Sequence, residues 1–347
     1  MEPRKMWDSH YVIQIAAASA ISACWLLPAF AGQADAAVDP DAAARDNWRS
    51  IIEHNPPSTD GCYTASYPDI VWEAVECKMG QPRVHPVRSK PASGGEDVTG
   101  NGKDYVAEAA GLISKTLGTF PSVTGVKTEK SVGVPLFGDG GILGPNEYTL
   151  QVNSNYTGTT SACAGHSGCT VWQQFIYSTD YLTEGEAEVF MQYWLIGWGS
   201  SACPGSFASA GGGDCYTNSN YASAPDMKIT TLGSLSLSGT VVAGGKDTVT
   251  FNNGTTAYSV TGPDSKLDIS AVWKESEFNV VGDAGGSRAD FNKGSSVTVK
   301  VALTDGSTTA PTCVANAGST GETNNLDLGA CSKAGGSTPS IQFTETH

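Results

Sequence analysis

The stretch Cys169-Thr-Val-Trp-Gln-Gln-Phe-Ile-Tyr-Ser178, followed closely by Val189-Phe-Met-Gln-Tyr-Trp-Leu-Ile196, decides the fold class of this chain. Both runs are rich in the aromatic and branched side chains that fit a pleated surface. Both also carry glutamine where a buried strand usually carries an aliphatic residue. A buried amide without a partner costs about 1–3 kcal/mol. We therefore expect these glutamines to face a wet groove or to serve in a site.

Short alternating runs of the same kind recur along the rest of the chain. They are found at 104–110, 148–153, 248–251, 257–260, 296–303 and 340–343, with Gly-, Asn- and Asp-rich turns between them. This pattern predicts an all-β domain over residues 96–347, an antiparallel β-sandwich of the concanavalin or jelly-roll type. Within it, only 111–117 and 267–274 suggest helix, and 197–224 predicts a disulfide-stapled loop beside the sheet.

The N-terminus has the pattern of an export signal. Arg4 and Lys5 precede an apolar segment, and Ala29-Phe-Ala31 offers a cleavage site between small residues, so residues 1–31 are expected to be a signal peptide. Attachment of a lipid at Cys24 is the weaker alternative, because an apolar Trp25-Leu-Leu-Pro28 follows it. We predict a secreted, extracellular protein with no integral membrane segment after signal removal.

Residues 32–95 differ in composition from residues 96–347. They are polar, with one short helix expected at 42–54 and a Pro-, Gly- and Ser-rich stretch at 81–95 that is typical of a linker. This N-terminal segment is too small to build a core of its own. We interpret it as a candidate propeptide. The alternative is a segment that stays attached and packs along the surface of the main domain.

Eight cysteines remain after the signal. They fall into four close pairs along the chain, which favours nearest-neighbour disulfides among the 105 connectivities that eight cysteines allow: Cys62 and Cys77, Cys163 and Cys169, Cys203 and Cys215, Cys313 and Cys331. Zinc ligation is the competing interpretation, but no C-x-x-C spacing occurs and histidines are few. We therefore expect disulfides, no metal and no cofactor.

The charge balance narrows the class of partner. Asp and Glu outnumber Lys and Arg by 35 to 20, which gives a formal net charge of −15. Binding to phosphates requires clustered basic residues, so a nucleic-acid partner is excluded. An acidic surface also suits a protein that stays soluble in acid.

Alternation within the strands decides which polar side chains share a face. In the run 273–282, the side chains of Glu275, Glu277 and Asn279 lie on one face. In the run 169–178, Trp172 and Gln174 lie on one face while Gln173 lies on the other. Only one of the two glutamines points into a given groove, and parity alone does not say which. For polar residues on such a strand, a solvated surface is the ordinary explanation.

At these residues the chain resembles the secreted glutamic peptidases, the fungal eqolisins and the plant neprosins that share their architecture. The strand pair of Gln173-Gln174-Phe-Ile-Tyr177 and Val189-Phe-Met-Gln-Tyr-Trp194 is similar to the eqolisin strand with the catalytic glutamine and the aromatic strand after it. Ser276-Glu277-Phe278 is similar to the later strand with the catalytic glutamate. The eqolisin Trp-Val-Gly-Ile-Asp-Gly signature is missing, and Leu150-Gln-Val-Asn-Ser154 stands at that strand.

The resemblance implies an acid endopeptidase. Glu277 is then the general base that activates water and returns the proton to the leaving amine, and Gln174 is the donor to the oxyanion. The side chains that line the cleft for the polypeptide substrate are expected to be Trp172, Gln192, Tyr193, Trp194 and Trp198.

The main alternative is a secreted binding module without catalysis, whose aromatic and amide-lined groove holds a glycan or a surface partner. A metal-assisted lectin needs clustered oxygen ligands, for which Asp283, Asp290 and Asn292 are the candidates. A glycoside hydrolase needs two carboxyl groups facing each other across a cleft, whereas Glu275 and Glu277 lie on one strand. A serine hydrolase built on Ser167 is disfavoured because a tight disulfide loop explains its surroundings.

Overall fold

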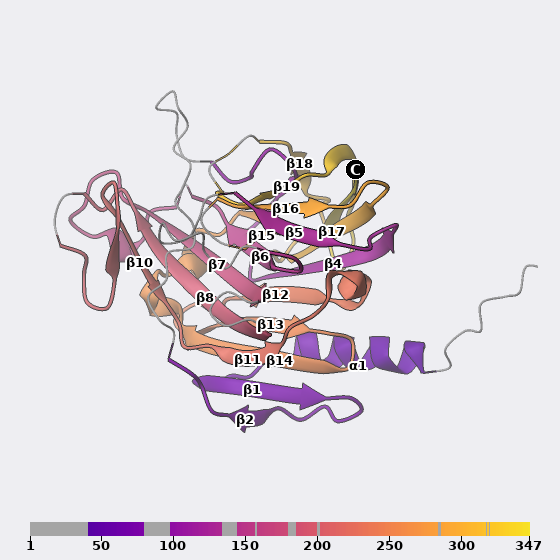
Figure 1. Cartoon of the computed structure of the whole chain (residues 1–347). Helices are drawn as coiled ribbons and strands as arrows, with labels where there is room; N and C mark the ends of the chain where they lie inside the picture. Colours follow the sequence, from indigo (N-terminus) through magenta and orange to yellow (C-terminus); the bar gives the residue numbers. More distant parts are fainter. Residues whose placement is uncertain are drawn as a thin grey trace, which may run out of the picture. The chain divides into compact units, whose positions relative to one another are not determined.

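The computed structural model describes residues 41–79, 98–133, 144–156, 158–179, 185–199, 202–283, 286–316, 318 and 320–347. The expected signal peptide and the expected linker at 81–95 lie outside these ranges. Over the described ranges the chain consists almost entirely of β-strands, with one α-helix (Figure 1). The predicted all-β, antiparallel sandwich is confirmed. No helix among the described residues combines the length and the apolar character that crossing a membrane requires.

The first sheet contains nine of the described strands, in the order β2–β1–β14–β13–β12–β4–β17–β21–β20. In that order their bounds are Glu73–Val75, Gly61–Ser66, Thr256–Pro263, Lys246–Asn252, Ser236–Thr240, Lys115–Thr124, Ser296–Thr304, Ser340–Thr346 and Asp327–Ala334. All neighbouring pairs are antiparallel. The central strands include the runs 248–251, 257–260, 296–303 and 340–343, where the sequence predicted strands.

The second sheet has the order β18–β3–β15–β6–β7–β8–β10–β9, and β11 also pairs with β8. The bounds are Thr312–Val314, Val106–Glu108, Glu275–Gly282, Tyr148–Ser154, Thr170–Thr179, Glu186–Ile196, Asp214–Asn218 and Ala208–Gly211, with Ala222–Pro225 for β11. A small third sheet joins β19 (Thr323–Asn324), β16 (Arg288–Phe291) and β5 (Glu129–Val132). Short 3-10 turns occupy Ser161–Cys163, Ile229–Ser234, Asp264–Lys266 and Ile269–Ala271.

Aromatic rings of the second sheet pack against glycines of the first. A Cβ at Gly118 would lie 2.1 Å from the ring of Phe278, and a Cβ at Gly239 would lie 2.5 Å from the ring of Phe175. Only glycine allows the two sheets to approach so closely at these points. Because side chains alternate along a strand, Glu277 and Gln174, which each precede one of these phenylalanines, point away from the glycines of the first sheet.

Residues 41–79, inside the expected N-terminal segment, belong to this fold. They form α1 (Ala42–His54), at the position predicted for a helix, and strands β1 and β2. The helix buries Trp48 and Ile52 in a cluster with Ala65 and Ala257. Strand β1 pairs with β14 along its full length, as Figure 1 shows at the edge of the sheet. The first sheet therefore begins well before residue 96.

Four disulfides form as the spacing predicted, between Cys62 and Cys77, Cys163 and Cys169, Cys203 and Cys215, and Cys313 and Cys331. Three local expectations were wrong. Residues 111–117 form no helix, since β4 begins at Lys115, and 267–274 contain only a 3-10 turn. The region 197–224 holds β9, β10 and β11 instead of a loop, because pairing with β8 satisfies the backbone of this Gly- and Ser-rich segment.

Candidate functional site

A row of polar side chains crosses the face of the second sheet that points away from the first. The pairing places Glu277 of β15 opposite Asn153 of β6, and Asn153 opposite Gln174 of β7. The row continues through Gln192 of β8 to Asn218 of β10. Directly opposed residues on neighbouring strands have Cβ atoms about 4.5–5.5 Å apart. Glu277 and Gln174 therefore share one face, with a single strand between them.

Hydrogen bonds connect the members of this row. Asn153 Nδ2 donates to Glu277 Oε2 at 3.2 Å. Gln174 Nε2 donates to Gln151 Oε1 at 3.1 Å, and Gln174 Oε1 accepts from Trp194 Nε1 at 3.2 Å. The amide of Gln174 is thus held in one orientation, with its donor nitrogen on the side of the acid.

The structure decides between the two adjacent glutamines. Gln173 points between the sheets, where its Nε2 donates to Asp247 Oδ2 of the first sheet at 3.0 Å. Gln174 points to the opposite face, as its bonds to Gln151 show.

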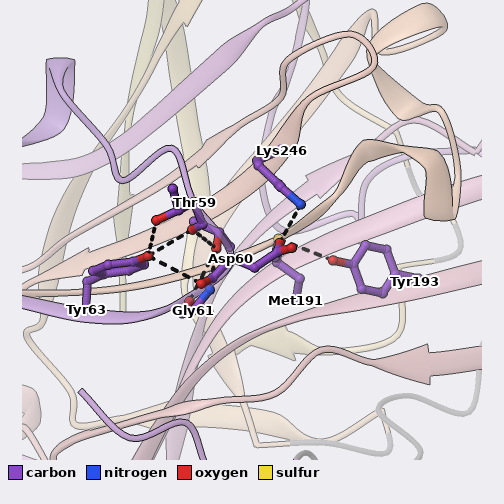
Figure 2. A network of polar contacts seen from close by, with 8 residues as sticks. Thr59, Asp60, Gly61, Tyr63, Met191, Tyr193 and Lys246 are labelled. Carbon is purple, nitrogen blue, oxygen red and sulfur yellow. Dashed lines mark hydrogen bonds and ion pairs between the residues drawn. The ribbon is translucent and has the colours of Figure 1, made fainter. Parts of the chain in front are cut away.

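The side chain of Tyr193 lies on the same face of the sheet as that of Gln173. It therefore does not line the expected cleft, and its predicted place among the cleft residues was wrong. Its hydroxyl donates to Met191 Sδ at 3.7 Å. Figure 2 shows it near Asp60 and Lys246, an ion pair of 2.6 Å.

The aromatic residues form a stacked cluster on the same face as Gln174. Ring centroids are 4.4 Å apart for Tyr156 and Trp172, 5.7 Å for Trp172 and Trp194, and 5.3 Å for Trp194 and Tyr216. Trp172 and Trp194 are 0% and 1% exposed, so they form a packed support and no open stacking platform.

The two remaining predicted contact residues have different places. Gln192 belongs to the row: its Nε2 donates to Asn218 Oδ1 at 2.7 Å, and its Oε1 accepts from Trp194 Nε1 at 2.8 Å. Trp198 lies apart from the row. It stacks on His166 at 3.3 Å between ring centroids and donates to the carbonyl of Ala202. The structure therefore brings together Glu277, Gln174, Trp172, Gln192 and Trp194, and it leaves Tyr193 and Trp198 outside the row.

Glu277 and Gln174 are 2% and 0% exposed. Burial raises the pKa of Glu277, and the hydrogen bond from Asn153 acts in the opposite direction. A pocket of about 440 Å³ opens beside this buried row. Its lining residues come from three segments of the chain, namely Glu108, Ala109, Asn155, Gly158, Thr159, Ala271, Val272, Lys274 and Glu275. Glu275 of this pocket lies two residues from Glu277 on β15, about 7 Å along the strand.

Three residues of this site were not singled out from the sequence: Gln151, Asn153 and Asp104. For the first two a signal exists, because amides at alternate positions of Leu150-Gln-Val-Asn-Ser154 repeat the pattern of the glutamine strand. For Asp104 there is none, since it lies in the turn before β3 and reaches Glu277 only through the tertiary fold.

Among the described residues, no group of three His, Cys, Asp or Glu side chains is arranged to hold a metal ion. The candidate lectin ligands have separate partners. Asp283 accepts from Ser178 at 2.7 Å, and Asp290 pairs with Arg288. Asn292 bonds backbone atoms of the segment 125–128.

Comparison with known proteins gives one structural similarity. The crystal structure of scytalido-glutamic peptidase with a transition state analog inhibitor matches 70% of this chain and 98% of its own, with 11% sequence identity and a TM-score of 0.31. No known protein-family profile and no curated protein sequence matches the chain. Because the TM-score and the identity are low, the chemistry of the site rests on the residues described above.

Proposed function

We propose that this protein is an acid endopeptidase in which Glu277 is the general base and Gln174 the oxyanion donor. The observation that carries the proposal is the cross-strand row: a carboxyl group and a side-chain amide, distant in sequence, lie on one face with only Asn153 between them. Hydrogen bonds hold both groups in fixed orientations. Preorganised groups of this kind are what hydrolysis of an amide requires.

The chemistry follows from these two groups. The Glu277 carboxylate removes a proton from water as the water oxygen bonds to the peptide carbonyl carbon, and the carbonyl electron pair moves to its oxygen. The Gln174 amide donates to that oxyanion. When the C–N bond breaks, Glu277 returns the proton to the nitrogen, which leaves as an amine.

Access to the row sets a condition on this proposal. Since Glu277 and Gln174 are buried, a peptide reaches them only if the residues that bury them move aside. The neighbouring pocket, lined by Glu275 and Asn155, is the nearest place for a substrate to enter. The proposed substrate is therefore an extended polypeptide that binds first at this end of the sheet.

We also infer export. Four disulfides form in oxidising compartments, and residues 1–31 carry the signal pattern. A removable propeptide is proposed only before residue 41, because residues 41–79 supply a helix and two strands to the sheet.

The test is incubation of purified protein with an acid-denatured protein substrate at pH 3–5. E277Q is expected to lower kcat by about 10²–10⁴-fold, the range for loss of a general base. Q174L is expected to lower it by about 10²–10³-fold, the range for loss of an oxyanion donor. The control is E73Q, at an exposed glutamate of β2 in the first sheet, which should retain activity.

Cleavage that survives E277Q removes Glu277 from the mechanism. An inactive wild type refutes the peptidase proposal and leaves the binding module as the better hypothesis, to be examined with glycan and polypeptide ligands.

A further inference from the structure

One amide oxygen of the row has no hydrogen-bond donor. Elsewhere in the row, Gln174 Oε1 and Gln192 Oε1 both accept from Trp194 Nε1. Asn153 Oδ1 is buried and has no hydrogen-bond partner among the described residues. It belongs to the residue that lies directly opposite both Glu277 and Gln174. The unsatisfied acceptor therefore stands between the two groups of the proposed mechanism.

The orientation of the Asn153 amide follows from its neighbours. Its Nδ2 donates to Glu277 Oε2 at 3.2 Å and to Gln151 Oε1 at 3.4 Å. An amide nitrogen carries two hydrogens, so both are used. A flipped amide would place its oxygen against these two acceptors and lose both hydrogen bonds. Asn153 Oδ1 is therefore held as an acceptor in one fixed direction, beside the acid.

Burial makes this free acceptor costly. Asn153 is 3% exposed, so its oxygen is removed from the water that satisfies it in the unfolded chain. Folded proteins seldom keep a buried polar atom without a partner, and each such atom calls for a specific explanation. An apolar side chain at this position would bring no unpaired oxygen. The place of the oxygen beside the general base supplies the explanation, since the reaction itself brings a donor.

That donor is the attacking water. Attack on a peptide carbonyl requires a water that gives one hydrogen to the base and turns a lone pair toward the carbonyl carbon. Its second hydrogen then needs an acceptor. Asn153 Oδ1 shares a carbon with Nδ2, which is 3.2 Å from Glu277 Oε2. One water, with hydrogen bonds of about 2.7–2.8 Å, can therefore reach both acceptors at once.

We propose that Asn153 is a third catalytic residue, whose Oδ1 accepts one hydrogen of the attacking water while Glu277 removes the other. The inference rests on the proposed function. A neutral amide oxygen takes up no proton, so the proton goes to Glu277 and from there to the leaving amine. The hydrogen held by Asn153 stays on the water oxygen. That oxygen becomes a hydroxyl of the tetrahedral intermediate, and the hydroxyl remains in the product carboxylic acid when the carbonyl re-forms and the C–N bond breaks.

The experiment compares pH profiles of kcat for wild type, N153L and N153D with an acid-denatured protein substrate. N153L removes the acceptor at similar volume. The maximum of its profile should fall by about tenfold, the scale of one lost hydrogen bond, with KM nearly unchanged because the peptide itself does not contact Oδ1. If Asn153 served only as a donor to Glu277, the midpoint of the profile would move and the maximum would stay, which would overturn the proposal.

N153D tests rescue by an oxygen at the same place. Two adjacent carboxyl groups share one proton in acid, so this variant still offers an acceptor to the water and a donor to Glu277. It should keep most of the wild-type kcat at the acid end of the profile. It should lose activity as the pH rises and both carboxyl groups ionise.

N252L is the control. Asn252 is a buried amide of β13 in the first sheet, and its Oδ1 accepts from the backbone N–H of Gly254 at 2.7 Å; its loss should leave the maximum of kcat unchanged. If N153L does not fold, N153D decides, and a low kcat for N153D even at the acid end overturns the proposal. An inactive wild type refutes the peptidase function and this role of Asn153 with it. An active wild type with an unchanged maximum in N153L overturns the role alone.

Discussion

Replacement of Asp247 by asparagine tests how buried carboxyl groups set the pH range of this protein. Asp247 lies between the two sheets, is 0% exposed and accepts one hydrogen bond, from Gln173. Burial raises its pKa from 3.8 to about 8, with Asp264 adding to the rise and the bond from Gln173 opposing it. The folded state therefore holds a proton on Asp247 that the unfolded chain releases above pH 4.

The sign follows from this difference in bound protons. Because the folded-state pKa is raised, the contribution to stability is fully present below pH 3.8 and is lost as the pH rises through about 8. Each pKa unit corresponds to about 1.4 kcal/mol, so the loss between pH 4 and pH 7 is at most about 4 kcal/mol. That is a large part of the roughly 5–15 kcal/mol by which domains are stable.

The assay is urea unfolding of wild type and D247N at a series of pH values from 4 to 7. D247N keeps an acceptor for Gln173 and stays neutral. As the pH rises, its free energy of unfolding should therefore increase relative to that of wild type by up to about 1.4 kcal/mol per pH unit. D327N is the control, since the side chain of Asp327 is 86% exposed, and its curve should run parallel to that of wild type. Parallel curves for D247N as well would refute the reasoning.

Two further predictions concern the fold. W48A should lower the free energy of unfolding by about 3–5 kcal/mol, the usual loss for a buried Trp, because Trp48 is 2% exposed. The control is D46A, at an exposed position of the same helix. A urea midpoint for W48A equal to that of D46A would show that α1 does not contribute to the stability of the domain. G118A should cost about 1–3 kcal/mol or more by overpacking, because its Cβ would lie 2.1 Å from the Phe278 ring. G233A, whose Cβ has 3.6 Å to its nearest neighbour, is the matched control, and equal melting temperatures for the two variants would contradict the packing described.

Much of the fold could be predicted because its determinants are local. Alternation of side chains at period two identified the strands around Gln174 and Glu277 and the residues that share a face with each. Short spacing along the chain favoured the four disulfide pairs that the structure contains. The predictions failed where propensity was weak and tertiary pairing decided, as at 111–117 and in the Gly- and Ser-rich region 197–224.

The candidate site divides in the same way. The sequence indicated Gln174 as an amide to consider because a glutamine stands in a strand where an aliphatic residue is expected. Glu277 was indicated only by the resemblance of Ser276-Glu277-Phe278 to a glutamic-peptidase strand. Parity could not choose between Gln173 and Gln174, because the choice depends on which face of the strand meets the other sheet. Asp104 carried no signal, since nothing local distinguishes a turn aspartate from one that contacts a distant glutamate.

The sequence by itself determined an all-β, disulfide-linked chain and the faces of its strands, because periodicity and cysteine spacing act over a few residues. Only the tertiary structure decided that β15, β6 and β7 are neighbours, that Glu277, Asn153 and Gln174 stand in register, and that Glu277 and Gln174 are buried. Strand order and register depend on contacts between residues more than a hundred positions apart, and the packing of the whole core selects them.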